Sequence, residues 1–290
     1  MKILGTYKNG NYSVCLLSDG SKIRYNDLDS LIPEKPESMD IKITNCCDMG
    51  CAMCHEDSSP DGEHGDIMNL PFLDTLLPYT ELAIGGGNPL KHPELSNFLI
   101  SLAERKLIAN MTVNQAHFMG SLSRIDALVS LKLIYGIGVS VTKVDDELVA
   151  ALRRYPNAVV HVINGVIDPE ELKKLYGCGL KLLILGYKQF RRGETYYSSA
   201  VQERMDKMSS LLPEILESFE VVSFDNLALR QLPVRDQMTE EEWNQFYMGD
   251  DGKFTMYVDA VKREFAKSST STERFALLDD VKEMFEAVRR

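Results

Sequence analysis

The sequence lacks any long apolar run, and this absence excludes several classes of protein. No stretch of about 18 consecutive apolar residues occurs, so none of the 290 residues is predicted to lie in a membrane-spanning helix. The first seven residues, Met1 to Tyr7, do not form the apolar region of a secretory signal. We therefore expect a cytoplasmic location, which also suits clustered free cysteines, because reducing compartments keep thiols unpaired.

Positive charge is also scarce, with 32 lysines and arginines against 43 acidic residues and a net charge of −11. Long nucleic acid is gripped by clustered Lys and Arg that neutralise its phosphates, so it is not an expected partner. One local basic cluster consists of Lys188, Arg191 and Arg192. This cluster is either an ordinary solvated loop or a site for a nucleotide phosphate or a substrate carboxylate.

Cysteine is rare, yet three of the six cysteines lie close together. Cys47, Cys51 and Cys54 have the spacing C-x₃-C-x₂-C, directly after the apolar run 39–44, which reads as a strand. Closely spaced thiolates usually hold a metal or an iron–sulfur cluster. A cubane cluster has four irons and normally takes four cysteines, so three ligands would leave one iron open to an outside ligand. An open iron at the end of a strand would be a reaction site.

The remaining cysteines are Cys15, Cys46 and Cys178. Cys46 is adjacent to the motif but out of register with its spacing, and we expect no second cysteine-rich cluster. A structural zinc site is an alternative, but zinc prefers four protein ligands, so His55 or His64 would have to complete it. An iron–sulfur electron carrier or sensor is a further alternative that the spacing leaves open.

The spacing, the preceding strand and the count of three cysteines resemble the radical S-adenosylmethionine (radical SAM) superfamily. The resemblance implies that a [4Fe-4S] cluster binds S-adenosylmethionine (SAM) at its open iron. The reduced cluster then cleaves SAM to a 5′-deoxyadenosyl radical, which abstracts hydrogen from a substrate. Met53 stands where the family usually has an aromatic residue, and its apolar, polarisable side chain can cover the same cluster face. An electron donor such as a flavodoxin or ferredoxin is also implied.

Strand-like and helix-like segments alternate after residue 38, which predicts a parallel sheet with helices outside it. Periodicity alone fits an open Rossmann-type sheet and a closed or partial barrel equally. The resemblance implies an α/β fold with a partial (β/α)6 TIM-like barrel. The expected strands are 39–44, 80–85, 108–114, 136–141, 158–163, 180–185 and 220–225, and the expected helices are 69–77, 93–105, 118–131, 145–154, 168–176 and 199–217.

The chain is expected to have three parts. Residues 1–38 form a small N-terminal β element, with hairpin turns at Asn9-Gly10 and Asp19-Gly20. Residues 39–225 form the core barrel. Residues 226–290 form a C-terminal α+β extension with a strand at 254–258 and a helix at 273–288.

Polar and glycine residues at the carboxyl ends of parallel strands are candidates for ligand binding. Gly85, Gly86, Gly87 and Asn88 match the position of the family's Gly-Gly-Glu motif, whose backbone contacts the SAM amino group, although Gly87 replaces the acid. The other candidates for cofactor binding are Asn114, Ser140, Lys143, Asn164 and Gly186.

The resemblance gives several of these candidates a role. Ser140 and Lys143 would hold the SAM carboxylate, Asn164 would contact ribose or adenine, and Gly186 would admit the adenine ring. His161 is expected to be a core residue. Asp225 and the residue after it would orient a substrate amine or hydroxyl, unless they form an Asx turn.

No residue is assigned to substrate acid–base chemistry. The sequence leaves no room for a cobalamin or RNA-binding domain, so a small molecule, a nucleotide or a short peptide is the expected substrate. Whether the reaction is an oxidation or a lyase-type step stays open.

Overall fold

The computed structural model describes residues 2–28 and 30–290. The N-terminal element is a three-stranded antiparallel sheet of β1 (Ile3–Asn9), β2 (Tyr12–Leu17) and β3 (Lys22–Tyr25). The expected hairpin turns are confirmed, and Gly10 has a φ of 60° there. A left-handed backbone conformation of this kind favours glycine.

The main sheet has ten strands in the order β10-β9-β8-β7-β6-β5-β4-β11-β12-β13. Strands β4 to β10 are all parallel, and each lies beside the strand that follows it in the chain. All seven strands coincide with the expected ones to within one residue at each end. Their bounds are β4 Ser38–Thr44, β5 Glu81–Gly86, β6 Ile108–Asn114, β7 Gly136–Ser140, β8 Ala158–Ile163, β9 Lys181–Leu185 and β10 Val221–Phe224.

Three strands from the expected extension join the same sheet. β11 (Thr255–Asp259) pairs in parallel with β4, while β12 (Glu264–Ala266) and β13 (Phe275–Ala276) add antiparallel pairs. The fold is therefore a mixed α/β fold around one large, mostly parallel sheet. The division of the chain at residues 38 and 225 stays a prediction.

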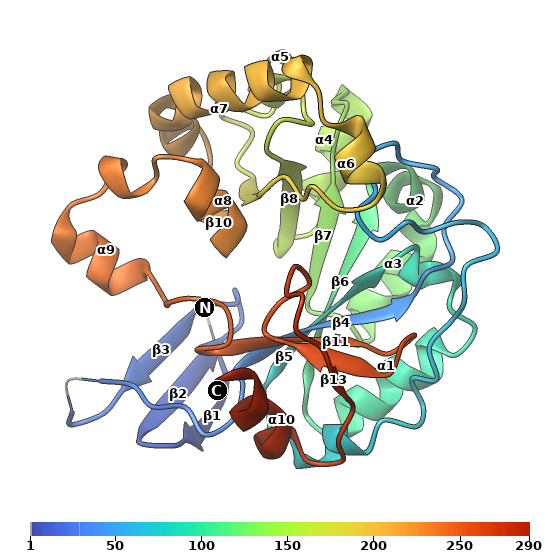
Figure 1. Ribbon diagram of the computed structural model, residues 1–290, viewed down its shortest axis with the longest axis vertical. Coiled ribbons are helices and arrows are strands. Elements are labelled where there is room, and N and C mark those ends of the chain that lie inside the picture. The colour runs from blue at the N-terminus through green and yellow to red at the C-terminus, as the bar shows by residue number, and fades with distance from the viewer. Residues whose placement is uncertain (1, 29) are drawn as a thin grey trace.

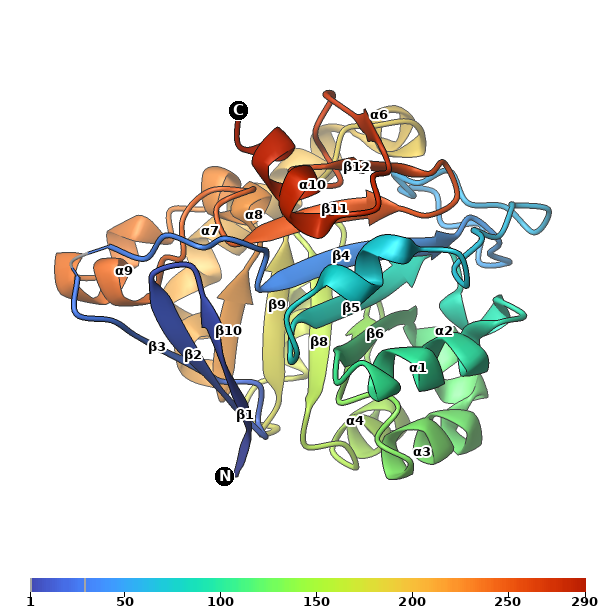
Figure 2. The ribbon, with the colours of Figure 1, turned by 90° about the horizontal axis from the view of Figure 1, so that it is seen from below.

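The helices that connect β5 to β10 cover one side of the sheet (Figure 1, Figure 2). None of the helices described is both long enough and apolar enough to cross a bilayer. Their bounds are α1 Leu95–Glu104, α2 Gln115–Gly120, α3 Leu122–Ser130, α4 Asp146–Leu152, α5 Pro169–Lys173, α6 Arg192–Tyr196 and α7 Ser199–Ser218, followed by α8 Asn226–Gln231, α9 Glu240–Phe246 and α10 Val281–Val288; short 3₁₀ turns are η1 Pro71–Thr75, η2 Pro89–Lys91 and η3 Arg235–Gln237.

Three helix predictions need correction. The segment 118–131 forms two helices, α2 and α3, because Ser121 leaves helical geometry with a φ of −130°. The segment 69–77 forms only the turn η1. The helix expected at 273–288 begins at residue 281, because residues 275–276 pair with β12 and the Asp280 side chain caps α10.

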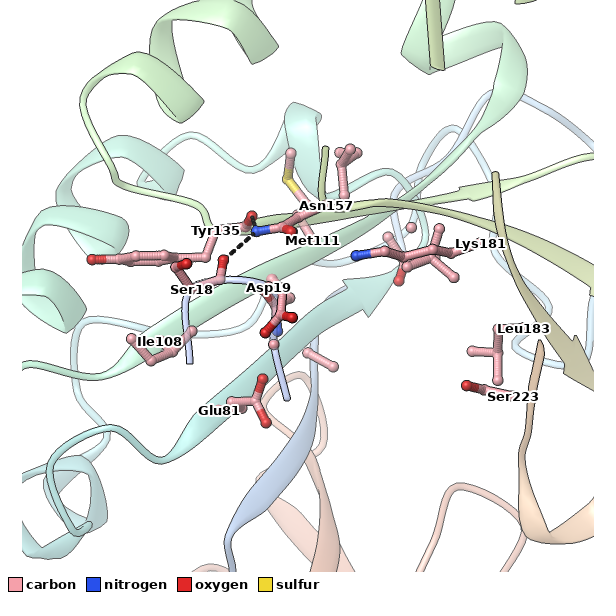
Figure 3. A pocket seen from close by; sticks show the side chains of 18 of the residues that line it. Ser18, Asp19, Glu81, Ile108, Met111, Tyr135, Asn157, Lys181, Leu183 and Ser223 are labelled. Atoms are coloured by element: carbon pink, nitrogen blue, oxygen red, sulfur yellow. Dashed lines mark hydrogen bonds between the residues drawn. The ribbon is translucent and has the colours of Figure 1, made fainter. Parts of the chain in front are cut away.

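One face of the main sheet packs on the helices, and we call the opposite face the inner face. It carries Ala83, Thr112, Gly138, His161 and Leu183, which line a cavity of about 340 Å³ (Figure 3). On the helix side, alternate residues such as those at 82 and 84 are fully buried. Small side chains on the inner face therefore leave open space where large ones would fill it.

The N-terminal element closes one end of this cavity. The hairpin tip at Ser18, Asp19 and Gly20 contributes to the lining, and Asn157 Nδ2 donates a 3.1 Å hydrogen bond to the Ser18 carbonyl oxygen (Figure 3). The cavity is therefore bounded by the tip of the small sheet and by the inner face of the large one.

Candidate functional site

The three-cysteine motif lies in one loop at the carboxyl end of β4. The loop is tied down by its backbone, since the Cys47 N–H donates to Ser59 O at 2.8 Å and the Cys54 N–H donates to Cys51 O at 3.2 Å. Cys47, Cys51 and Cys54 are all free and partly buried. Burial raises the pKa of the Cys51 thiol, and the neighbouring thiols of Cys54 and Cys47 raise it further. The three thiols thus lie in one short loop with fixed backbone geometry.

The glycine loop after β5 packs directly against the start of the cysteine loop. The Gly87 N–H donates to Thr44 O at 2.7 Å, and the Asn88 N–H donates to Cys46 O at 2.7 Å. A Cβ atom at Gly87 would lie only 2.5 Å from the Cys46 carbonyl oxygen. Any side chain at this position would displace the start of the cysteine loop, so the packing requires glycine at Gly87.

The other two glycines of this loop differ in their surroundings. Gly86 has a φ of 114°, and a Cβ atom there would lie 2.4 Å from Thr44 O. At Gly85, a Cβ atom would meet no atom within 4 Å. Gly85 pairs in register with Lys42 on the inner face, so its missing side chain leaves space beside the cysteine loop.

Two of the expected cofactor residues are helix caps. The Asn88 Oδ1 accepts a hydrogen bond from the Leu90 N–H, and the Asn114 Oδ1 accepts one from the Ala116 N–H. Their roles in SAM binding stay predictions. Ser140 lies beside Asn114 in the register of β6 and β7, so these two side chains share the inner face.

His161 continues this row on β8, where it pairs in register with Ser140. Its ring lies over Gly138, since a Cβ atom there would lie 2.3 Å from His161 Cε1. Burial lowers the pKa of His161 to about 4, so the ring is neutral at neutral pH. The expectation of an ordinary core histidine missed that this ring lines the inner cavity. The glycine at position 138, on the neighbouring strand, is the sequence feature that could have indicated this cavity.

The last three expected cofactor residues lie farther along the sheet. Lys143 is exposed, and its backbone N–H and carbonyl bond to the side chain of Gln115. Asn164 is buried and donates to Gln231 Oε1 at 3.3 Å. The space beside Gly186 is filled by Leu227 of α8, whose Cγ would lie 2.4 Å from a Cβ atom there. No observation tests the roles assigned to these residues, which stay predictions.

A buried ion-pair network that sequence reasoning missed joins β4, the cysteine loop and β11. Lys42 has only 2% of its side chain exposed, and its Nζ lies 2.6 Å from Glu56 Oε2 and 3.1 Å from Asp259 Oδ2. Burial alone would raise the pKa of Glu56, but the hydrogen bond to His55 and the charges of His55 and Lys42 hold it well below its usual range. A lysine inside an apolar strand was the signal for this network.

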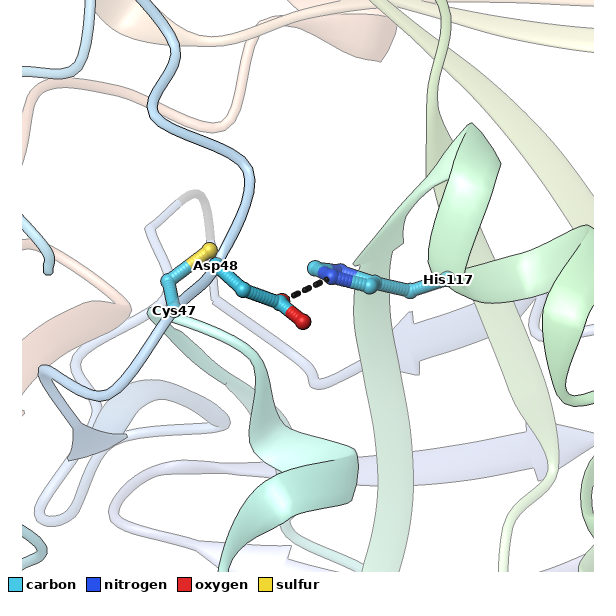
Figure 4. Close-up of side chains that lie close together, drawn as sticks. All are labelled: Cys47, Asp48 and His117. Atoms are coloured by element: carbon cyan, nitrogen blue, oxygen red, sulfur yellow. Dashed lines mark hydrogen bonds and ion pairs between the residues drawn. The ribbon is translucent and has the colours of Figure 1, made fainter. Parts of the chain in front are cut away.

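A second polar group fixes the cysteine loop from the other side (Figure 4). Asp48 accepts hydrogen bonds from His117 Nε2 at 2.8 Å and from Lys91 Nζ at 2.9 Å, through its two different oxygens. Donor atoms of Cys47, Asp48 and His117 lie within 4.8 Å of one another. Both carboxylate oxygens are thus already used, and the group links the loop to α2 and η2.

Asp40 lies on the inner face two residues before Lys42, between Ala83 and Tyr257 of the neighbouring strands. Burial raises the pKa of its carboxyl to about 6; the Lys188 charge opposes this, and the charges of Asp225 and Asp251 add to it. The side chain nevertheless remains accessible from the open space around it.

We expect the substitution Asp40→Asn to stabilise the protein more at pH 8 than at pH 5. At pH values above the raised pKa, the folded protein carries an unfavourable carboxylate charge, and this charge lowers its stability. At pH values below the pKa of the unfolded chain, the carboxyl is protonated in both states and the loss of stability disappears. Urea unfolding at both pH values measures the difference. Glu104→Gln, the same charge change on exposed α1, is the control. An equal effect of Asp40→Asn at both pH values would contradict the pKa assignment.

No protein-family model matches the sequence, and no curated protein matches it. Three solved structures of SuiB from Streptococcus suis do share the fold. At 12–15% identity, this likeness shows a common fold and nothing finer.

The three SuiB structures differ in what is bound. The structure with precursor peptide SuiA has a TM-score of 0.60 at 15% identity, over 88% of this chain and 65% of that one. The structure with S-adenosylmethionine has a TM-score of 0.56 at 14% identity, over 88% and 64%. A third SuiB structure has a TM-score of 0.58 at 12% identity, over 99% and 87%. This chain thus spans just under two thirds of the first two.

Proposed function

We propose that this protein is a radical SAM enzyme. Cys47, Cys51 and Cys54 would hold a [4Fe-4S] cluster, and SAM would bind between the cluster and the inner face. The main sheet would form a partial (β/α)6 barrel around this site. The observation that carries the proposal is that all three motif cysteines are free thiols in one loop at the carboxyl end of β4, next to the glycine loop with its open space at Gly85.

The donor set fits the cluster. Three soft thiolate ligands suit an iron–sulfur cluster and leave one iron free. When bound, the cluster and SAM supply a 5′-deoxyadenosyl radical that abstracts a hydrogen atom from the substrate. The protein supplies the binding and the orientation of these groups.

The residues of this chain have distinct parts in the proposal. The backbone around Gly85, Gly86 and Gly87 holds the SAM amino group, and Ser140 with Lys143 holds its carboxylate. Asn114, Asn164 and Gly186 contact the nucleoside part of SAM, and Asn88 holds the glycine loop in place. With SAM and substrate bound, the inner face shields the reacting carbon from water.

The electron donor would be a flavodoxin or ferredoxin in the cytoplasm. A small molecule, a nucleotide and a short peptide all fit the expected substrate range. Among these, the peptide has support from the fold, because a SuiB structure of the same fold holds a precursor peptide.

A zinc site is the second candidate function, favoured by the close approach of Cys47, Asp48 and His117. This group uses one cysteine of three, and Lys91 and His117 already occupy its carboxylate. The histidines that would complete a zinc site with the cysteines are also engaged, since His64 Nδ1 lies 2.8 Å from Thr44 Oγ1. The iron–sulfur cluster is therefore the better proposal.

Anaerobic reconstitution with iron and sulfide distinguishes the iron–sulfur cluster from the zinc site. We expect a brown protein with about four irons per chain that absorbs near 400 nm, as cubane clusters generally do. A colourless protein that takes up zinc in place of iron would refute the cluster. A brown protein that does not bind SAM would be an electron carrier.

Two glycine substitutions are expected to separate SAM binding from folding. Gly85→Val places a side chain in open space and should weaken SAM binding about tenfold, which is roughly 1.4 kcal/mol, with little loss of stability. Gly86→Ala should destabilise the protein by at least about 1 kcal/mol, because its φ is unsuitable and its Cβ meets Thr44 O. Equilibrium dialysis with SAM and urea unfolding measure the two effects. Unchanged SAM affinity in Gly85→Val would place SAM elsewhere.

A further inference from the structure

The strand β10 ends one side of the main sheet, and its whole length faces a groove. Residues 221–224 line this groove of about 700 Å³, and Ser38, Asp40 and Thr255 of β4 and β11 line it from across the opening. The outer edge of a terminal strand presents unpaired backbone N–H and C=O groups. An extended peptide can pair with such an edge as an added strand.

Aromatic side chains form much of the remaining wall. Trp243, Phe246, Tyr247 and Phe254 line the groove, and they belong to α9 and the segment that leads from it to β11 (Figure 1). Phe246 is 63% exposed, which is unusual for so large an apolar side chain. Trp243 and Tyr247 are partly exposed beside it, and exposed apolar surface within a groove is typical of a binding site.

The groove carries charge of only one sign. Four aspartates line it, at positions 40, 225, 250 and 251, and none of the described residues that line it is Lys, Arg or His. Arg235 and Lys253 pack on Trp243 and Phe254 but are not part of the lining. A positively charged ligand is therefore complementary to the groove, and a second copy of this acidic chain is not.

Three of these aspartates already have partners within the protein. Asp225 accepts the N–H groups of Gly186 and Ala228 and caps α8, so it forms the Asx turn that the sequence left open. Tyr247 donates to Asp250 at 2.9 Å, and Asn226 donates to Asp251 at 2.8 Å. The Asp40 carboxylate has no hydrogen bond or ion pair with any residue that the structure describes, and it is accessible from the groove.

We infer that this groove binds an extended basic peptide segment, which pairs along β10 and places a lysine or arginine side chain at the Asp40 carboxylate. The inference rests on the proposed function in one respect, because it names the substrate class of the same site. Ser223 lines both the groove and the inner cavity, so the groove adjoins the inner face of the sheet. The binding itself needs neither cluster nor SAM.

Trp243 is the only tryptophan of the chain and lines the groove, so its fluorescence reports on occupancy. The probe is a capped heptapeptide of alternating valine and lysine, titrated into the full-length reconstituted protein. We expect saturable binding that is at least tenfold tighter than that of the matched valine–glutamate peptide. Asp40→Asn should weaken binding of the lysine peptide about tenfold, whereas the surface control Glu104→Gln should leave it unchanged.

Two further arms test the peptide geometry on the unaltered protein. Methylation of alternate backbone nitrogens on one edge of the lysine peptide should weaken binding at least tenfold, because those N–H groups can no longer pair with β10. Free lysinamide should bind much more weakly than the peptide. Equal binding of the lysine and glutamate peptides, or of peptide and lysinamide, would overturn the inference, as would an unaffected Asp40→Asn variant.

The cluster variant Cys51→Ala separates this inference from the proposed function. We expect it to bind the lysine peptide as tightly as the unaltered chain. If the protein binds the peptide but never cleaves SAM, the groove is still a peptide-binding site, and only its role as a substrate site is refuted. If the protein cleaves SAM but does not bind the peptide, the inference about the groove is refuted and the proposed function is not.

Discussion

The substitution Cys51→Ala is expected to abolish both iron binding and SAM cleavage. Cys51 lies between the other two motif thiols in the loop, and both act on its pKa. Two cysteines cannot hold a cubane cluster that has already lost its fourth protein ligand. Iron analysis, the absorbance near 400 nm and chromatography of 5′-deoxyadenosine measure the loss.

The neighbouring Cys46 provides the control for this substitution. It lies outside the motif, and its thiol donates only to Pro60 O at 3.3 Å. Its carbonyl, which accepts the Asn88 N–H, is retained in alanine. Cys46→Ala should therefore keep the iron content and the activity. If Cys46→Ala lost the cluster and Cys51→Ala kept it, the assignment of the three ligands would be wrong.

Among the substitutions proposed for this protein, Lys42→Met is expected to lower the free energy of unfolding most. It leaves Asp259 as a buried carboxylate without its cation. It also leaves Glu56 with only His55 and the half-exposed Arg191 as partners. Removing one partner of a buried ion pair typically costs about 3–5 kcal/mol. The expected fall in Tm is on the order of 10 °C. Urea and thermal unfolding of the two proteins measure both quantities.

Lys91→Met makes the same chemical change in an exposed ion pair. The side chains of Lys91 and Asp48 are 39% and 49% exposed, and such pairs contribute about 0–1 kcal/mol. Neutralising both acids in Lys42→Met, with Glu56→Gln and Asp259→Asn, should restore part of the lost stability. Similar effects of Lys42→Met and Lys91→Met would show that the buried network does not hold the fold together.

The parallel strands could be predicted because each is a short run of Val, Ile and Leu that is buried against the helices, with turn residues at its ends. The helix at 273–288 was predicted too long because Phe275 fits an apolar stripe equally well in a strand, and its pairing with β12 depends on distant residues. Helices α8 and α9 were not predicted, since their stripes are short and their packing is tertiary.

The site could be predicted only where its residues are neighbours in the chain. The cysteine motif and the glycine loop are local patterns, and the structure brings them together through two backbone hydrogen bonds. The contact of Lys42 with Asp259 joins residues more than two hundred positions apart, and the groove at Asp40 exists only because β10 ends the sheet. The lysine in an apolar strand signals a buried partner, but no local pattern identifies that partner or places the groove.

The most direct test of the proposed chemistry is the yield of 5′-deoxyadenosine. The 290-residue chain is reconstituted anaerobically, reduced with dithionite and incubated with SAM. The proposal predicts 5′-deoxyadenosine and methionine in equal amounts, above the yield of the Cys51→Ala protein. A fully loaded iron–sulfur protein that leaves SAM intact under these conditions would contradict it.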